Sequence, residues 1–177
     1  EHCTYCIIPQ VRGVSVSRPV SEILSQARRM VDGGYVELAL TGVHTGSFGH
    51  DVKHSDGLVD LLEALEQIPG LHRIRLNSVE PNFVTDALID FARHSSRLCR
   101  HYHIPLQSGD DTVLRRMGRR YDRAHYADRI QRLASGVPDA CIGADVMVGF
   151  PGETEQQFEN TYALLDELPM SYLHAFS

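Results

Sequence analysis

No stretch of this sequence approaches the roughly 20 consecutive apolar residues that a membrane-spanning helix needs. It also has no recognisable signal peptide, internal repeat, low-complexity tract or linker. We therefore predict a single domain over residues 1–177 in the cytoplasm, with no membrane partner. Basic residues are not in excess, since 17 Lys and Arg face 23 Asp and Glu and the net charge is -6. Any contact with nucleic acid must then be local or be made by another part of the protein.

Cysteines are few, and their spacing does not suggest a disulfide framework. Cys3 and Cys6 form a Cys-x-x-Cys with the aromatic Tyr5 between them, and two soft thiolates at this spacing can ligate a metal or an iron–sulfur cluster. Half a zinc site or two inert thiols are the alternatives. Cys99 and Cys141 lie beside expected strands and are interpreted as small core residues without a role.

Helical and strand patterns alternate along the whole chain. The apolar periodicity predicts helices at 20–31, 56–68, 82–93, 110–117, 122–134 and 154–167, and strands at 35–43, 73–79, 101–106, 141–148 and 172–176. Asp56 is expected to cap the second helix, and Thr154 with Gln157 matches a capping box. This alternation indicates an α/β fold with a parallel sheet. A closed eight-stranded barrel takes about 250 residues, so we predict an open, partial TIM-type barrel, with a doubly wound sheet as the alternative.

Polar and glycine-rich segments follow the predicted strands, at 41–42, 78–81, 107–109 and 149–153. In a parallel sheet the carboxyl ends of the strands meet at one edge, where ligands bind. We therefore expect the functional site at this edge.

Three groups of histidine or arginine residues stand out, and the first two admit two interpretations each. His101 and His103 share one face of a strand and, with Asp145, could begin the metal site of a hydrolase, although a hydrogen-bonded pair is favoured. A second group is basic and is either an RNA-phosphate patch or a solvated helix face: Arg115, Arg116, Arg119, Arg120 and Arg123. The third group is interpreted as part of a solvated loop: His44, His50 and His54.

Taken together, several segments resemble the radical S-adenosylmethionine methylthiotransferases. They are CTYCIIPQVRG at 3–13, SRP at 17–19, LTGVHTGSFG at 40–49, NSVEP at 77–81, HYHIPLQSGDD at 101–111, MGRRY at 117–121, DVMVGFPGETE at 145–155 and LHAFS at 173–177. The eight segments occur in family order across nearly the whole chain. Val43-His44 after LTG is similar to the MtaB-type branch, which acts on N6-threonylcarbamoyladenosine in tRNA.

The resemblance implies a 4Fe–4S cluster that binds S-adenosylmethionine at its open iron and generates an adenosyl radical. Cys3 and Cys6 would be cluster ligands, and Tyr5 would pack on the adenine of the cofactor. The family motif has a third cysteine, which would lie two positions before Glu1. The other cofactor-binding residues implied by the resemblance are Thr41, Gly42, Ser78, Glu80, Gln107, Ser108, Arg119 and Gly149. No side chain is assigned as catalytic.

The family also carries a second 4Fe–4S cluster in an amino-terminal domain and a carboxy-terminal RNA-binding domain. The resemblance therefore implies a radical-domain core without its first strand, acting in a longer protein on the anticodon loop of tRNA with flavodoxin or ferredoxin as electron donor. The chain alone is expected to be inactive, and an uncovered strand edge is expected to favour self-association. A radical enzyme with another substrate and a non-catalytic metal-binding module are the alternatives.

Overall fold

The parallel α/β architecture predicted from the sequence is confirmed. The structure is a computed structural model that describes residues 3–52 and 57–177. The strands are β1 (Glu37–Leu40), β2 (Arg73–Leu76), β3 (His101–His103), β4 (Cys141–Met147) and β5 (Tyr172–Phe176). Among the described residues every strand pairing is parallel, with β1 on β2 and β4 between β3 and β5. A parallel bridge from Ile74 to Leu98, and the N–H of Val79 that donates to the carbonyl of His103 at 2.9 Å, link the two groups of strands into one open, unclosed arrangement.

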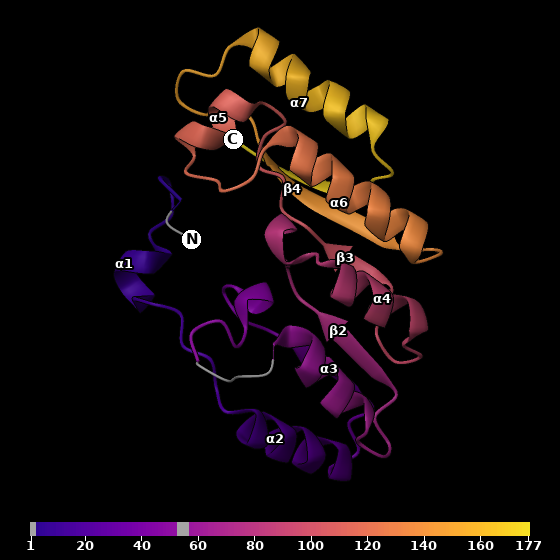
Figure 1. Ribbon diagram of the computed structural model, residues 1–177. Coiled ribbons are helices and arrows are strands. Elements are labelled where there is room, and N and C mark those ends of the chain that lie inside the picture. The colour runs from indigo at the N-terminus through magenta and orange to yellow at the C-terminus, as the bar shows by residue number, and fades with distance from the viewer. Residues whose placement is uncertain (1–2, 53–56) are drawn as a thin grey trace.

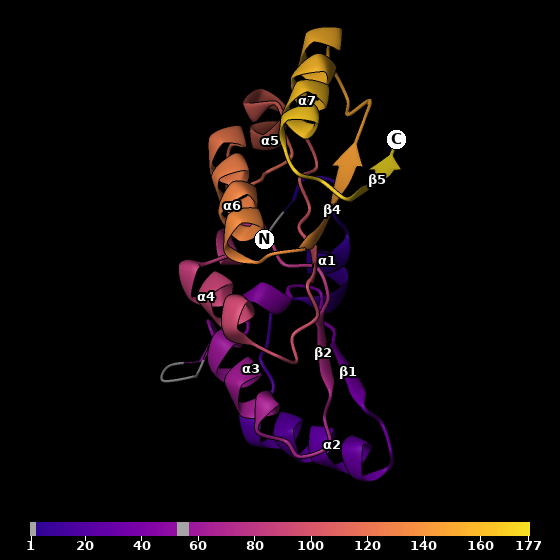
Figure 2. The ribbon, with the colours of Figure 1, turned by 90° about the vertical axis from the view of Figure 1, so that its right-hand side faces the viewer.

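The helices lie mainly along one side of these strands. They are α1 (Ile8–Arg12), α2 (Val20–Asp32), α3 (Leu58–Glu66), α4 (Asp86–His94), α5 (Asp111–Arg116), α6 (Arg123–Gly136) and α7 (Glu155–Glu167). Figure 1 shows the order of the elements, and Figure 2 shows α3, α4 and α6 in a row beside β1, β2 and β4. In the described part of the chain, no helix is both long and apolar enough to cross a membrane.

The five predicted strands are all present along the chain, but several end earlier than their apolar runs. β3 stops at His103 because Pro105 has no backbone N–H to continue the ladder. The chain still follows β4, since the N–H of Ile104 donates to the carbonyl of Gly143 at 2.8 Å. The strand prediction for 172–176 is confirmed at both ends.

Helix starts follow their capping residues. The Thr154–Gln157 capping box is present at the start of α7, as predicted. The helix predicted from residue 82 is wrong at its start: a 3-10 turn occupies Pro81–Phe83, and α4 begins only after Thr85, whose hydroxyl accepts from the N–H of Leu88 at 3.2 Å. The prediction failed because apolar residues occur at helical spacing both before and after Thr85, so the sequence pattern does not show where the 3-10 turn ends and α4 begins.

The predicted cap of the second helix cannot be assigned to Asp56, which lies outside the described residues, as does His54. The N-cap of α3 is Gly57, whose N–H donates to the carboxylate of Asp60 at 2.8 Å. The acidic side chain in the first turn thus supplies the capping interaction.

The core lies between the strands and the helices. Leu62 and Leu65 of α3 are fully buried, as are Ile74 of β2 and Ile142 of β4. Burial of each such side chain stabilises the fold by about 1.5–3 kcal/mol. The alternate residues of β4, which include Asp145, face away from this core. The sheet therefore presents a polar face opposite its helices.

Candidate functional site

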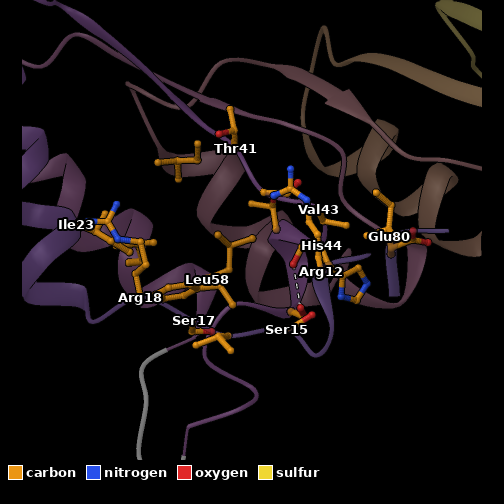
Figure 3. Close-up of a pocket in the computed structure, with 18 of the residues that line it drawn as sticks. Arg12, Ser15, Ser17, Arg18, Ile23, Thr41, Val43, His44, Leu58 and Glu80 are labelled. Atoms are coloured by element: carbon orange, nitrogen blue, oxygen red, sulfur yellow. Dashed lines mark hydrogen bonds between the residues drawn. The ribbon is translucent and has the colours of Figure 1, made fainter. Parts of the chain in front are cut away.

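Seven of the eleven predicted site residues line one cavity. It has a volume of ≈ 1130 Å³ and lies between the cysteine loop, α2, α3 and the segment after β1. The predicted residues that line it are Cys3, Tyr5, Cys6, Thr41, Gly42, Glu80 and Arg119. Figure 3 shows Thr41, His44 and Glu80 among the lining side chains. The carboxyl ends of β1 and β2 thus face the loop that carries the two thiols.

The cysteine loop is a tight turn fixed to the end of α5. The N–H of Cys6 donates to the carbonyl of Cys3 at 3.1 Å, which closes the turn. Thr4 holds the turn in place, because its N–H donates to the carbonyl of Met117 at 3.0 Å and its hydroxyl donates to that of Arg116 at 2.9 Å. Neither cysteine forms a disulfide with another described residue, and both are half-buried. The anchoring by Thr4 was not predicted, because it depends on a contact between segments that are distant in the sequence.

Arg119 connects the cysteine loop to the end of β2. Its Nη1 lies 3.0 Å from both carboxylate oxygens of Glu80, and its Nη2 donates to the hydroxyl of Tyr5 at 2.7 Å. The side chains of Arg119 and Glu80 are only 6% and 17% exposed. This network joins three residues that the sequence had placed in the site one by one.

The charges of this network are set by burial and by near neighbours. Burial raises the pKa of Tyr5 to about 12, although the nearby Arg119 opposes the rise. Burial works against the charged form of Arg119, but Tyr121 and Glu80 outweigh it and raise the pKa of the guanidinium. At neutral pH the site therefore contains a neutral phenol and a permanently charged guanidinium.

The segment after β4 lies against the same loop. The ring of Phe150 meets that of Tyr5 edge to face at 6.3 Å, and Arg116 lies over the Phe150 ring at 5.4 Å. Gly149 has a φ of +73°, which favours glycine, and an added Cβ there would meet nothing within 4 Å. The peptide face at Gly149 is thus open to a flat ligand, and its predicted role at the cofactor stays a prediction.

Gly149 does not line the cavity, and neither do three other predicted residues. Ser108 is fully buried, with its hydroxyl 3.3 Å from that of Thr161 on α7. Gln107 is buried at a φ of +69°, and its N–H donates to the carbonyl of Asp145 at 2.8 Å. Ser78 is half-buried at the end of β2. Cofactor binding by these residues stays a prediction, while Ser108 and Gln107 shape the turn after β3.

The segment after β1 is held by Phe83, a residue that the sequence analysis did not single out. The Phe83 ring packs edge to face against His44 at 5.0 Å and against His50 at 5.2 Å. A Cβ added to Gly46 would lie 2.5 Å from the Cβ of Phe83, so glycine permits this close approach. The solvated-loop interpretation is therefore wrong for His44, which is half-buried, whereas His50 is exposed.

The five arginines of the basic cluster differ in their burial and in their hydrogen-bond partners. Arg119 is buried in the ion pair with Glu80. Arg116 donates to the carbonyl of Gly152 at 3.2 Å, and Arg123 donates to that of Asn160 at 2.7 Å. Arg115 and Arg120 are exposed. The arginines thus form no single solvated helix face, and their contact with RNA stays a prediction.

His101 and His103 are bridged by a tyrosine from β5. The Tyr172 hydroxyl lies 2.9 Å from Nε2 of His101 and 3.1 Å from Nδ1 of His103. The favoured interpretation of a hydrogen-bonded pair is therefore confirmed. Cys99 and Cys141 are half-buried free thiols, away from the cavity lining.

The residues of the cavity fit an iron–sulfur cluster and a nucleoside-containing cofactor. Two thiols from one anchored turn are the soft donors that iron–sulfur clusters require. The Tyr5 ring belongs to the same turn, and the Phe150 ring packs against it edge to face. A third cluster ligand would have to come from outside the lining described here, because Cys3 and Cys6 are its cysteines.

Comparison with known families agrees with this geometry. Residues 1–165 match the model of the radical SAM superfamily, and the chain belongs to that superfamily. Its members use a 4Fe–4S cluster and S-adenosylmethionine. The metal-dependent hydrolase alternative is a different class of enzyme and is not supported.

Among curated proteins, the chain is similar to tRNA methylthiotransferases. It is 44% identical over 174 residues to the threonylcarbamoyladenosine tRNA methylthiotransferase MtaB of Bacillus subtilis, covering 98% of the chain and 39% of that protein. It is 41% identical over 166 residues to the tRNA-2-methylthio-N(6)-dimethylallyladenosine synthase of Desulforamulus reducens, covering 94% of the chain and 36% of that protein. The chain thus spans less than half the length of these relatives.

A solved structure with the same fold is the cobalamin-dependent S-adenosylmethionine radical enzyme OxsB, with a TM-score of 0.59 at 12% identity. The match covers 82% of this chain and 22% of OxsB. At this identity the likeness supports the fold alone. It agrees with the open, partial barrel predicted from the sequence.

Proposed function

We propose that this chain is the radical-domain core of a tRNA methylthiotransferase that adds a methylthio group to N6-threonylcarbamoyladenosine next to the anticodon. The observation that carries the proposal is the anchored turn of Cys3 and Cys6 at the wall of a large cavity, beside Tyr5 and Arg119. The 44% identity to the Bacillus subtilis enzyme supports the choice of reaction. Val43-His44 after the first strand supports the threonylcarbamoyl branch.

Cys3 and Cys6 would hold two irons of the 4Fe–4S cluster. When bound, the cluster and S-adenosylmethionine supply the radical chemistry that activates an unreactive C–H bond. Tyr5 keeps its ring beside the thiols because Arg119 holds its hydroxyl at 2.7 Å. Thr41 and Gly42 at the end of β1 would bind the polar end of the cofactor across the cavity.

Glu80 is held in this wall by Arg119 and would present a carboxylate to the amino or ribose groups of the cofactor. The apolar side chains on the α2 and α3 side of the cavity, Ile23 and Leu61 among them, would exclude water from the reacting atoms. The protein's part is therefore binding, orientation and desolvation rather than acid–base chemistry.

The remaining parts of the proposal concern the whole protein. The tRNA anticodon loop would be the substrate, a second 4Fe–4S cluster in an amino-terminal domain would be used for sulfur insertion, and flavodoxin or ferredoxin would donate electrons in the cytoplasm. The edge that the family's first strand would pair is that of β1, and among the described residues β1 pairs only with β2. An uncovered edge of this kind favours self-association of the isolated chain.

The decisive experiment uses the full-length protein that carries this chain. After anaerobic reconstitution with iron and sulfide, the protein is reduced with dithionite in the presence of S-adenosylmethionine, and 5′-deoxyadenosine is measured. The Cys3→Ala and Cys6→Ala variants should each form no 5′-deoxyadenosine and should bind less iron than the wild type. Cys99→Ala is the matched control, because its thiol lies outside the cavity lining, and it should keep both.

The substrate is tested with two tRNAs, one carrying threonylcarbamoyladenosine and one carrying dimethylallyladenosine, followed by mass spectrometry of the nucleosides. Methylthiolation of the first alone supports the proposal. Methylthiolation of the second tRNA alone would assign the chain to the branch that acts on dimethylallyladenosine. Formation of 5′-deoxyadenosine without methylthiolation of either tRNA would indicate a radical enzyme of another substrate class. A well-reconstituted protein that forms no 5′-deoxyadenosine overturns the enzymatic proposal and favours a metal-binding module.

A further inference from the structure

Three side chains on the polar face of the sheet converge outside the cavity described above. His103 of β3, Asp145 of β4 and His174 of β5 place one ligand atom each within 4.8 Å of the others. Asp145 stands opposite His174 in the strand register, and His103 stands beside Gly143, two residues earlier on β4. Because the side chains of a strand alternate, all three point away from the helices.

We propose that His103, Asp145 and His174 bind a divalent first-row transition ion such as Zn²⁺. Nε2 of His103 lies 3.0 Å from Oδ1 of Asp145, and Nδ1 of His174 lies 3.4 Å from the same oxygen. Ligand atoms about 2.0–2.2 Å from a shared ion lie roughly 3–3.5 Å from each other. The two distances therefore suit atoms that surround one ion.

The hydrogen bond at the far side of the His103 ring orients it for this role. Its Nδ1 lies 3.1 Å from the Tyr172 hydroxyl, which leaves Nε2 directed at Asp145. A partner of this kind on the second nitrogen is usual for metal-binding histidines. Gly143 makes room for the Tyr172 ring, since a Cβ added there would lie 2.0 Å from Cζ of the tyrosine.

The donor set and its exposure indicate the class of ion. Two imidazole nitrogens and one carboxylate oxygen suit zinc, iron or cobalt, whereas magnesium and calcium prefer oxygen ligands alone. The side chains of His103, Asp145 and His174 are 11%, 23% and 57% exposed, so water can complete the coordination. The ion would tie β5 to β3 and β4 at the exposed end of the sheet.

This site differs from the pair that the sequence suggested. Nε2 of His101 is engaged by Tyr172 at 2.9 Å, so His174 of the neighbouring strand takes its place as the second imidazole. The proposal is also independent of the radical chemistry, because none of its three residues lines the cavity of Cys3 and Cys6.

Cobalt titration of the purified full chain tests the site. The protein carries Cys3→Ala and Cys6→Ala so that the thiol loop cannot bind the metal. Co²⁺ should bind one per chain and give a visible d–d absorption without a thiolate charge-transfer band. Zn²⁺ should displace it and raise the thermal unfolding midpoint, because an ion that binds only the folded state stabilises it.

In the same background, His174→Gln should weaken Co²⁺ binding at least about ten-fold, since even outer-shell changes cost that much. Asp145→Asn should act in the same direction. His94→Gln is the matched control, because His94 is an exposed histidine on α4, and it should leave binding unchanged. His174 is exposed, so its variant is expected to fold even where Asp145→Asn does not.

Absence of the d–d band, or binding that His174→Gln does not weaken, overturns the proposal. The three residues then form an ordinary hydrogen-bonded cluster in which the His103 ring donates to Asp145. A band that persists in His174→Gln with thiolate charge transfer would assign the metal to Cys99 or Cys141 and would also overturn it. None of these outcomes depends on whether the protein cleaves S-adenosylmethionine.

Discussion

Arg119 and Glu80 form a nearly buried ion pair, with Nη1 of the arginine 3.0 Å from both carboxylate oxygens. The pair joins the segment after α5 to the end of β2 at the wall of the candidate site. Arg119→Met should lower the free energy of unfolding by about 3–5 kcal/mol, because it leaves a buried carboxylate without its partner. Urea unfolding followed by circular dichroism measures the change.

The control for this prediction is Arg115→Met. Arg115 is exposed on α5 and donates to the hydroxyl of Thr112, so its loss should change stability by no more than about 0.5 kcal/mol. Equal effects of the two substitutions would show that the Arg119–Glu80 pair contributes no more than a surface contact.

Replacement by phenylalanine should have opposite effects on stability at two buried tyrosines, Tyr102 and Tyr126. The Tyr102 hydroxyl is buried and has no hydrogen-bond partner among the described residues, whereas the Tyr126 hydroxyl donates to the carbonyl of Ile104 at 2.9 Å. Tyr102→Phe should stabilise the protein by about 1 kcal/mol, and Tyr126→Phe should destabilise it by about as much. Thermal unfolding of both variants, measured side by side, checks the signs. Destabilisation by Tyr102→Phe would mean that its hydroxyl is satisfied.

Acid should weaken the contact between α5 and α7 through Asp110. Burial works against the charged form of Asp110, but hydrogen bonds from Asn160 and from the N–H groups of Val113 and Thr112 hold its pKa below the usual value. Its stabilising effect is thus present at neutral pH and is lost as the pH falls through the lowered pKa. Asp110→Ala should cost about 0.5–2 kcal/mol at pH 7, as expected of a helix N-cap.

Unfolding of the wild type and of Asp110→Ala across an acid series tests this linkage. The difference between the two proteins should shrink toward low pH. A difference that stays constant with pH would assign the effect to packing rather than to the carboxylate.

The turn after β3 leaves no space for a side chain at Gly109. An added Cβ would lie 2.7 Å from Cα of Thr161 and 3.0 Å from the carbonyl oxygen of Asn160, both in the backbone of α7. Gly109→Ala should therefore destabilise the fold by about 1–3 kcal/mol. Gly42→Ala is the control, since its nearest neighbour would be Oγ1 of Thr45 at 3.4 Å. Urea unfolding that gives the same midpoint for both variants would contradict the argument.

Much of the fold was predictable because the elements follow local patterns. The apolar stripes of α2 and α3, and the capping box at Thr154, depend only on residues a few positions apart. The convergence of Thr41 and Glu80 followed from one rule, that parallel strands end at the same edge. α1 was missed because a helix of five residues is too short to show a period.

The contacts between distant segments were not predictable in the same way. The sequence indicated Tyr5, Glu80 and Arg119 as separate site residues, but their mutual hydrogen bonds depend on how a loop, a strand end and a helix end meet. The polar cluster on the sheet shows the same limit. His174 joins His103 and Asp145 because of the register between β4 and β5, which no local pattern encodes.

The attachment of the cysteine turn has a consequence for how the thiols are positioned. Thr4 donates hydrogen bonds to the last carbonyl groups of α5. At the other end of α5, the carboxylate of its N-cap Asp110 accepts from the side-chain amide of Asn160 on α7 at 2.8 Å. The position of the two thiols therefore depends on α7, which is about 150 residues away in the sequence. The short helix α5 connects the two, because it contacts both the cysteine turn and α7. Loosening of α7 would therefore displace the turn of Cys3 and Cys6 relative to the rest of the cavity, although α7 contacts neither residue through these bonds.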